Sequence, residues 1–497
     1  MRVYLIGVST VTVISAAVVL LALPGVLADS PPAKKSYVGS SQCGACHAAY
    51  FKTWKKTAHS VYIHGIKKKD LRGMPVDGKI KTIGSPATVK FKLASQGAKL
   101  LLTLYDLSNQ NSSTTYEIWR TQGGNGVAGK VRLLIRQDET TMMSPVQWNH
   151  LDPTRKGDDK FSAYNPEHWY NSYGTLILNG GIAAPAFAQS QLINSWERRC
   201  MGCHTTGTKL KYVAATGKFV DESNELNIGC EACHGPGSEH VAGPSPLNIV
   251  NPASLEKQKG LDVCARCHIR GSSVDKGKAA FTLGWPAWVK KNKVRLYWQT
   301  GGKNELAGMY VGGEGVWNSD DSKWRKYATS TNFSTQHHQQ GYDYIQSGKW
   351  GEMPWQDVKC WECHNPHKSG VKGTAQLLMS VDDNELCLSC HASHGFANNT
   401  EILAHTGHSS VNSVHCVDCH MPKTTKSQAW WTESGGDIHA HTFEAINPNL
   451  TKLMAKKNKG TVADGKAITN GCYKCHRDGD YGAARWKRWE AAKGSTE

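Results

Sequence analysis

Four short stretches in the first third of the chain alternate apolar and polar residues. They are VKFKLA at 89–94, KLLLTLYDL at 99–107, TTYEIWRTQ at 114–122 and VRLLIRQ at 131–137. Turn-forming Gly, Asn and Ser residues separate them, and alternation of this kind is typical of half-buried β-strands. The pattern therefore predicts a small β-rich insertion at about residues 75–140.

A long uncharged apolar run, residues 3–28, opens the chain after Arg2. It ends in Val26-Leu27-Ala28, the kind of small-residue pattern at which signal peptides are cleaved. We expect residues 1–28 to be a signal peptide and the mature chain to be exported, to the periplasm or the cell surface. The alternative is an uncleaved segment, which would be the only link to a membrane, because about 20 apolar residues suffice to span a bilayer.

Helix signals elsewhere are short. WERRC at 196–200 and DDNELC at 382–387 read as single-turn helices, the second with an Asp-rich N-cap. Each leads directly into a cysteine, so the function of these helices depends on the chemistry of the cysteines.

Every one of the 16 cysteines belongs to a Cys-x-x-Cys-His unit, the signature of c-type haem attachment. In such a unit two thiols form thioethers with one haem, and the histidine binds the iron as the first axial ligand. The units, numbered 1 to 8 in chain order, are Cys43-Cys46-His47, Cys200-Cys203-His204, Cys230-Cys233-His234, Cys264-Cys267-His268, Cys360-Cys363-His364, Cys387-Cys390-His391, Cys416-Cys419-His420 and Cys472-Cys475-His476.

Two other uses of Cys-x-x-Cys compete with this interpretation. Zinc sites normally gather four ligands at paired spacings, and disulfides give no reason for the fixed histidine. Eight units with no cysteine left over favour eight covalently attached haem c groups.

The haems also change the interpretation of the charge. Lys and Arg exceed Asp and Glu by 58 to 41, a net charge of +17. Counting two propionates per haem and the iron, the loaded protein carries roughly +9 when oxidised and +1 when reduced. The basic excess therefore compensates propionates and does not predict nucleic-acid binding.

Low-spin electron-transfer haems usually take a second histidine, and 14 histidines remain beyond the CxxCH units. Several lie beside a unit, where the local chain cannot fold back over its own iron, so each would serve a different haem. The expected second ligands are His59, His240, His367, His394, His408, His415, His439 and His337, with three choices left open: His405 against His408, His441 against His439, and His338 against His337.

The segments GCEACHGPGSEHV at 229–241, CWECHNPH at 360–367 and CVDCHMP at 416–422 resemble the multihaem c-type cytochromes. That group includes octahaem cytochromes related to hydroxylamine oxidoreductase, octahaem reductases and multihaem electron carriers. The resemblance covers residues 40–60 and most of 196–445, and it implies that His240 and His367 are second ligands. Reductase members often carry a CxxCK unit, which this chain lacks, so the resemblance does not favour a reductase.

The resemblance implies a mainly α fold with extensive loops, packed around haems. We expect a first haem segment at 29–74, the β-rich insertion at 75–140 between the first and second haem, and a haem-dense domain with seven haems at 141–497. Relatives often place a ligand shortly before the CHxPH unit, where this chain has Lys349, with Met353 four residues on.

Two functions fit these features. The first is an exported octahaem cytochrome that moves electrons along closely packed haems in respiratory or extracellular electron transfer, with self-assembly into a filament as a variant. The second is an octahaem oxidoreductase that acts on a small nitrogen or sulfur compound at one open haem. In both, the partners are redox proteins or terminal electron acceptors; the catalytic residues, the donor and the direction of electron flow stay open.

Overall fold

The computed structural model describes most of the chain outside the N-terminal segment and several internal stretches. The described residues are 35–66, 71–109, 111–124, 128–137, 140–152, 155–177, 196–213, 218–255, 257–268, 271–273, 310–312, 316–317, 333–335, 337–345, 358–368, 376–427 and 431–494. The expected signal peptide, Lys349 and Met353 lie outside them, so these predictions stay as they were made.

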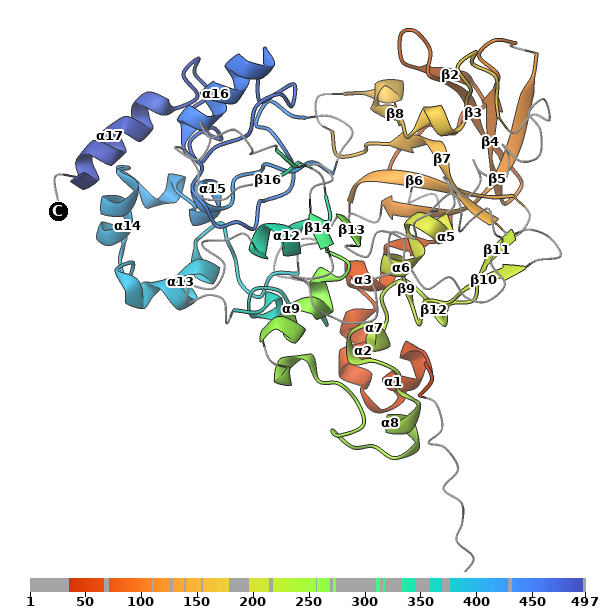
Figure 1. Ribbon diagram of the computed structural model, residues 1–497, viewed down its shortest axis with the longest axis horizontal. Coiled ribbons are helices and arrows are strands. Elements are labelled where there is room, and N and C mark those ends of the chain that lie inside the picture. Colours follow the sequence, from red (N-terminus) through yellow and green to blue (C-terminus); the bar gives the residue numbers. More distant parts are fainter. Residues whose placement is uncertain are drawn as a thin grey trace, which may run out of the picture.

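One large antiparallel sheet forms the part of the molecule drawn at the upper right of Figure 1. Its strands follow one another in chain order, and the two-residue β1 pairs with β5 beside this meander. The strands are β1 (Ile63–His64), β2 (Ile80–Ile83), β3 (Val89–Gln96), β4 (Lys99–Tyr105), β5 (Ser113–Gly124), β6 (Ala128–Gln137), β7 (Thr140–Trp148) and β8 (Phe161–Ala163).

The alternating pattern produces the core of this sheet. Val89, Phe91 and Leu93 of β3 are fully buried, while the lysines between them are half-buried. A two-residue turn joins β3 to β4, and its Gly97 adopts a φ of +59°, a conformation that glycine reaches without strain. The four strands predicted from the sequence correspond to β3, β4, β5 and β6.

The sheet is larger than predicted, because β7 and β8 extend it to Ala163. All of residues 141–149 are buried, so β7 is covered on both faces and has no polar alternation to reveal it. Trp148, Phe161 and Trp169 join the sheet's hydrophobic core.

Helices surround the CxxCH units, and those within the described ranges are all short, with 12 residues in the longest. They are α1 (Ser40–Cys46), α2 (Ala48–Trp54), α3 (Ala58–Val61), α5 (Trp196–Arg199), α6 (Met201–His204), α7 (Cys230–His234), α8 (Ser238–Ala242), α9 (Lys257–Ala265), α12 (Gln340–Ile345), α13 (Glu385–His391), α14 (Asn399–Thr406), α15 (Cys416–His420), α16 (Pro448–Asn458) and α17 (Ala483–Gly494). The mainly α fold expected from the resemblance is therefore not confirmed, since the helices are brief and the sheet is large.

Short strand pairs complete the described chain. They are β9 (Thr205–Thr206) with β12 (Glu225–Leu226), β10 (Leu210–Val213) with β11 (Lys218–Asp221), β13 (Gly271–Ser273) with β14 (Tyr310–Gly312), and β15 (Val316–Trp317) with β16 (Phe333–Ser334). Among the described residues, no helix has the length and apolar character needed to cross a membrane.

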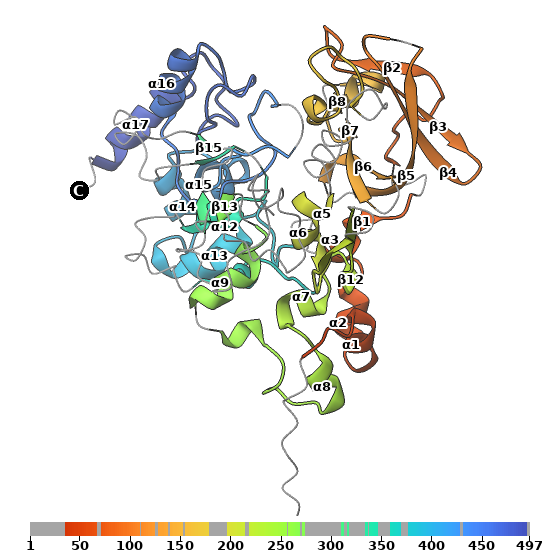
Figure 2. The ribbon, with the colours of Figure 1, turned by 45° about the vertical axis from the view of Figure 1, so that its right-hand side comes forward.

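Helices of the first and third units lie together at one extremity of the molecule, and α13 to α17 lie at another (Figures 1 and 2). The sheet contacts the helices at a small core of Ile63, Leu134, Met143, Trp196 and Met201. The helix pair that carries the second unit is therefore packed directly on the sheet.

Both helices read from the sequence are present. WERRC becomes α5 and leads into unit 2, and DDNELC leads into α13 and unit 6. The N-cap of α13 is Asn384, however, and its side chain does not cap the helix. Its carboxamide instead accepts a hydrogen bond from the Cys416 N–H (2.7 Å) and donates to the Val414 carbonyl (3.0 Å), which ties unit 6 to unit 7.

Candidate haem sites

Each CxxCH unit forms a tight turn that brings its two sulfurs to one side. In units 1, 4, 5 and 8 the histidine N–H donates to the carbonyl of the first cysteine at 2.9–3.0 Å, a helical i to i+4 bond. Residues three apart lie on the same face of such a turn. Both thiols can therefore reach one ring, with the histidine directly beyond them.

None of the 16 cysteines forms a disulfide, and all lie in the described part of the chain. The thiols stand for the thioether sulfurs of the haem-bound protein. Their arrangement accordingly reports how the rims of neighbouring haems would lie.

Sulfurs of different units approach one another in a definite order. Side-chain hydrogen bonds join Cys43 to Cys230 (units 1 and 3), Cys203 to Cys267 (2 and 4), Cys264 to Cys360 (4 and 5) and Cys387 to Cys416 (6 and 7). Electrostatic interaction without a hydrogen bond relates Cys233 to Cys267 (3 and 4), Cys363 to Cys390 (5 and 6) and Cys419 to Cys472 (7 and 8). The units form a row 1–3–4–5–6–7–8, with unit 2 attached beside unit 4.

Seven CxxCH histidines face a second histidine from another part of the described chain. The pairs, CxxCH histidine first, have ring centres separated as follows: His47 and His240 6.3 Å, His204 and His338 6.1 Å, His234 and His367 6.0 Å, His268 and His59 6.2 Å, His364 and His441 6.3 Å, His420 and His405 6.0 Å, and His476 and His408 6.3 Å.

These separations fit an iron between each pair of rings. A metal–imidazole bond is about 2.0–2.1 Å long and the ring centre lies about 1.1 Å beyond the bound nitrogen, so two rings on opposite sides of one iron have centres about 6.3 Å apart. Direct stacking would bring the rings closer, as Tyr62 and His204 do at 5.0 Å. The residues present therefore fit haem.

Hydrogen bonds orient several of these rings for ligation. The Nδ1 of His234 donates to the Val250 carbonyl (2.8 Å), that of His408 to the Thr406 carbonyl (2.9 Å) and that of His441 to the His439 carbonyl (3.0 Å). Such a bond fixes the tautomer and leaves Nε2 available to a metal.

Burial keeps the innermost imidazoles neutral, which is the form that binds iron. It lowers the pKa of His59 to about 4 and those of His204 and His441 to about 3. The charge of Arg132, on β6, lowers the pKa of His204 further. The sheet thus contributes a cation near unit 2.

Unit 6 differs from the other seven. The ring that contacts His391 belongs to His394, three residues on at the end of η8 (Ala392–His394), with centres 6.0 Å apart. Three residues of 3₁₀-helix advance only about 6 Å, whereas ligands on opposite sides of an iron hold their Cα atoms roughly 12 Å apart. His394 therefore lies on the same side as His391, and its Nδ1 contacts the Cys390 carbonyl at 3.1 Å.

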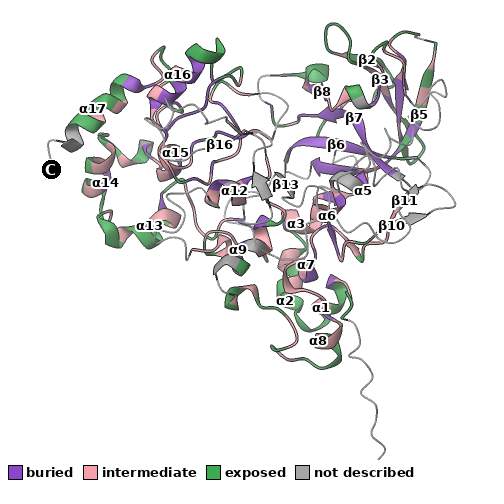
Figure 3. Cartoon of the chain, viewed as in Figure 1, coloured by how far each residue is buried: buried purple, intermediate pink, exposed green. Residues whose placement is uncertain are grey.

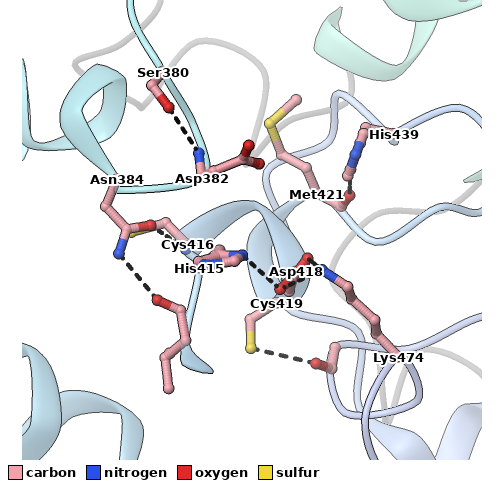
Figure 4. Close-up of polar contacts among 12 residues, drawn as sticks. Ser380, Asp382, Asn384, His415, Cys416, Asp418, Cys419, Met421, His439 and Lys474 are labelled. Atoms are coloured by element: carbon pink, nitrogen blue, oxygen red, sulfur yellow. Dashed lines mark hydrogen bonds and ion pairs between the residues drawn. The ribbon is translucent and has the colours of Figure 1, made fainter. Parts of the chain in front are cut away.

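Two more expected ligands lie near units 6 and 7 without facing a CxxCH histidine in the described part of the chain (Figure 4). His415 Nδ1 is 3.4 Å from the Asp418 carboxylate, which also pairs with Lys474. His439 Nδ1 contacts the Met421 carbonyl at 2.5 Å. The pairing instead uses the neighbour His441.

The structure places the alternative histidines as follows. His405 and His408 each face a different unit, and His338 faces unit 2 while its neighbour His337 packs edge-on against it at 4.3 Å. His338 has a φ of +68°, a rare backbone conformation for a residue other than glycine. His59, His240 and His367 each face a unit other than their nearest one. Which histidines bind iron stays a prediction throughout.

All 16 cysteines lie in CxxCH turns, and histidines lie at the spacing of six-coordinate iron. These two features define the class of protein. The chain is a multihaem c-type cytochrome and attaches haem covalently through its CxxCH motifs. The family model for cytochrome c554 and c-prime matches residues 42–92 and 160–235, and that for the doubled CXXCH motif matches residues 353–396.

Among curated proteins, the chain is similar to dissimilatory sulfite reductase MccA of Wolinella succinogenes. They are 21% identical over 483 residues, covering 86% of this chain and 58% of that protein. Multiheme cytochrome MtrA of Shewanella baltica is 25% identical over 218 residues, covering 41% of this chain and 56% of that protein. The chain thus spans less than two thirds of the length of either relative.

Among solved structures, the outer cell wall cytochrome OcwA has the same fold. It aligns with a TM-score of 0.52 at 18% identity, covering 91% of this chain and 86% of that chain.

Proposed function

We propose that the protein is an exported octahaem cytochrome that conducts electrons along a row of closely spaced haems. The observation that carries the proposal is the order in which the cysteines of neighbouring units interact, from unit 1 to unit 8, by hydrogen bonds in some places and by electrostatic interaction alone in others. Haem iron supplies the one-electron chemistry, and the polypeptide fixes where each iron lies.

The cysteines keep the electron path short. A sulfur sits on the rim of its haem, so a hydrogen-bonding contact such as Cys264 with Cys360 would bring two haem edges within a few ångströms. Tunnelling slows steeply with distance, and near-contact of successive edges therefore favours transfer along the row. Unit 2 would be a side branch reached through Cys203 and Cys267 of unit 4.

The histidine pairs favour conduction over catalysis. Two imidazoles fill both axial positions of an iron, whereas an enzymatic haem needs an open position and a shaped pocket. Seven units have a histidine at the spacing required for the second position.

Export and an extracytoplasmic partner complete the proposal. Residues 3–28 are uncharged and end in a small-residue pattern. The likeness in fold to an outer cell wall cytochrome is compatible with such a location.

A second function is favoured by unit 6 alone. If His394 lies on the same side as His391, the sixth position of that iron would be open to a small nitrogen or sulfur compound, and the protein would be an oxidoreductase. The name of its relative from Wolinella succinogenes, a sulfite reductase, makes sulfite the first compound to test.

Electron paramagnetic resonance of the oxidised protein separates the two functions. An all-low-spin spectrum, with no carbon monoxide bound after reduction, supports the conduit. One high-spin iron per chain that binds carbon monoxide, together with reoxidation of the reduced protein by sulfite, hydroxylamine or nitrite, supports the enzyme.

A further inference from the structure

Unit 8 stands at one end of the row of units. Unit 7 adjoins it within the described chain, because the Cys419 Sγ contacts the carbonyl of Gly471, the residue before Cys472, at 3.3 Å. It is followed directly by α17, and α16 packs against α17 in the same corner of the molecule (Figure 1). Residues 448–491 therefore surround the last haem position.

This corner is strongly basic. Residues 448–491 contain ten Lys and Arg against four Asp and Glu, a net charge of +6 out of +17 for the whole chain. Loading unit 8 with a ferric haem and its two propionates would remove only about one charge. Over a third of the excess positive charge thus lies within less than a tenth of the chain. This local charge is larger than one haem can compensate.

Most of these cations are exposed and unpaired within the described chain. Three are in ion pairs, Lys474 with Asp418, Arg477 with Glu433 and Arg485 with Asp478. Others project from α16, from α17 and from the loop between α16 and unit 8, where Figure 3 shows exposed surface. The exposed cations without an ion pair among the described residues define the terminal basic surface: Lys452, Lys456, Lys459, Lys466, Lys487 and Arg488.

The helix that carries two of these cations is held firmly on the haem row. The indole N–H of Trp489 donates to the His405 carbonyl at 2.6 Å, and its ring lies edge-on to the His405 ring. Lys487 and Arg488 are exposed beside that anchor. The cations are therefore fixed relative to the electron path.

We propose that the terminal basic surface is the docking site for an acidic one-electron carrier protein that exchanges electrons with unit 8. The inference rests on the proposed conduit function and adds a place and a partner chemistry to it. Complementary charge speeds and orients the encounter of two proteins. In the exchange, one electron leaves the reduced carrier and converts one ferric iron to ferrous; no bond or proton is transferred.

The test uses reduced plant-type [2Fe–2S] ferredoxin, an acidic one-electron carrier of low potential, as the probe. Its rate of reducing the full haem-loaded chain is measured by stopped flow at several salt concentrations. Reduced methyl viologen, a small cation, serves as the comparison reductant.

Two double variants with the same change in net charge are compared. Lys456→Glu/Lys487→Glu alters the terminal basic surface, and Lys79→Glu/Lys156→Glu alters exposed lysines of the sheet region. At low salt we expect the rate of reduction by ferredoxin to fall about tenfold or more in the first variant and less than twofold in the second. The rate of reduction by viologen should be unchanged in both. The wild-type ferredoxin rate should fall steeply with salt.

An equal loss in both variants, or no loss in the first, overturns the docking site while leaving the conduit intact, provided that viologen still reduces all haems. If viologen reduces only a fraction of the haems, the conduit fails and the docking proposal fails with it.

Discussion

Replacing His240 by alanine tests the axial pairing at its best-defined place. His240 faces His47 with ring centres 6.3 Å apart and planes inclined by 17°. Its Nδ1 contacts the Ser245 carbonyl at 3.0 Å and the Asn248 side-chain oxygen at 3.1 Å, which directs Nε2 toward His47. His240→Ala removes the second ligand and leaves the thioether cysteines and His47 in place.

The expected change is confined to one iron. About one eighth of the haem should pass from low spin to high spin, and the reduced variant should bind one more carbon monoxide per chain than the wild type. The potential of that iron should rise, because a donor ligand that favours the ferric state is lost. The fold should survive, since the lost hydrogen bonds cost only about 1–3 kcal/mol.

The assay is carbon monoxide titration of the reduced protein together with electron paramagnetic resonance of the oxidised protein. His64→Ala is the matched control, because the ring nitrogens of His64 contact the carbonyls of Gly65 (3.0 Å) and Gly123 (2.9 Å). If His240→Ala keeps the wild-type spin state and carbon monoxide stoichiometry, His240 is not a ligand and the spacing argument fails.

Four further predictions follow from other parts of the chain. The purified protein should contain eight haems in a pyridine haemochrome assay, and six or fewer would contradict the assignment of the CxxCH units. Mass spectrometry should place the mature N-terminus near Asp29; a chain that retains residues 2–28 would favour a membrane anchor. The buried Glu231 carboxylate accepts backbone N–H bonds from Val38, Gly39 and Gly237. Glu231→Gln should therefore lower the free energy of unfolding by about 2–4 kcal/mol and expose the segment at 35–39 to trypsin; unchanged digestion would contradict this. Burial raises the pKa of Glu197 to about 8, so between the unfolded-state pKa and pH 8 the folded state binds one proton more than the unfolded state. Stability should therefore fall as pH rises through this window. Glu197→Gln should flatten the dependence of Tm on pH, and parallel profiles for both proteins would refute the prediction.

The sheet shows what the sequence can and cannot reveal about the fold. β3 and β4 were predictable because each has one buried and one partly exposed face, which leaves an alternating pattern. β7 was not, because both of its faces are covered and its residues carry no period. The two short helices predicted before units 2 and 6 are present, because their signals lie in the local sequence.

The candidate second ligands show a different limit. The motifs around His59, His240 and His367 identified histidines that do face a CxxCH histidine, but local sequence could not say which one. Between near neighbours such as His439 and His441 the choice depends on tertiary packing alone, and the structure brings His441 to unit 5.

The crossing of these pairs has a consequence for how the fold is held together. His240, just after unit 3, faces unit 1; His367, just after unit 5, faces unit 3; and His59, after unit 1, faces unit 4. If each pair shares an iron, every such iron joins segments far apart in sequence, and its bond energy becomes folding energy. The main apolar core near the first units belongs to the sheet, whose members run from Met74 to Leu176 with no CxxCH unit among them. The sheet can therefore gain stability from its own side chains. A second apolar core around α16 includes Tyr473 of unit 8, and the shared irons would add cross-links between the units that lie outside these two cores.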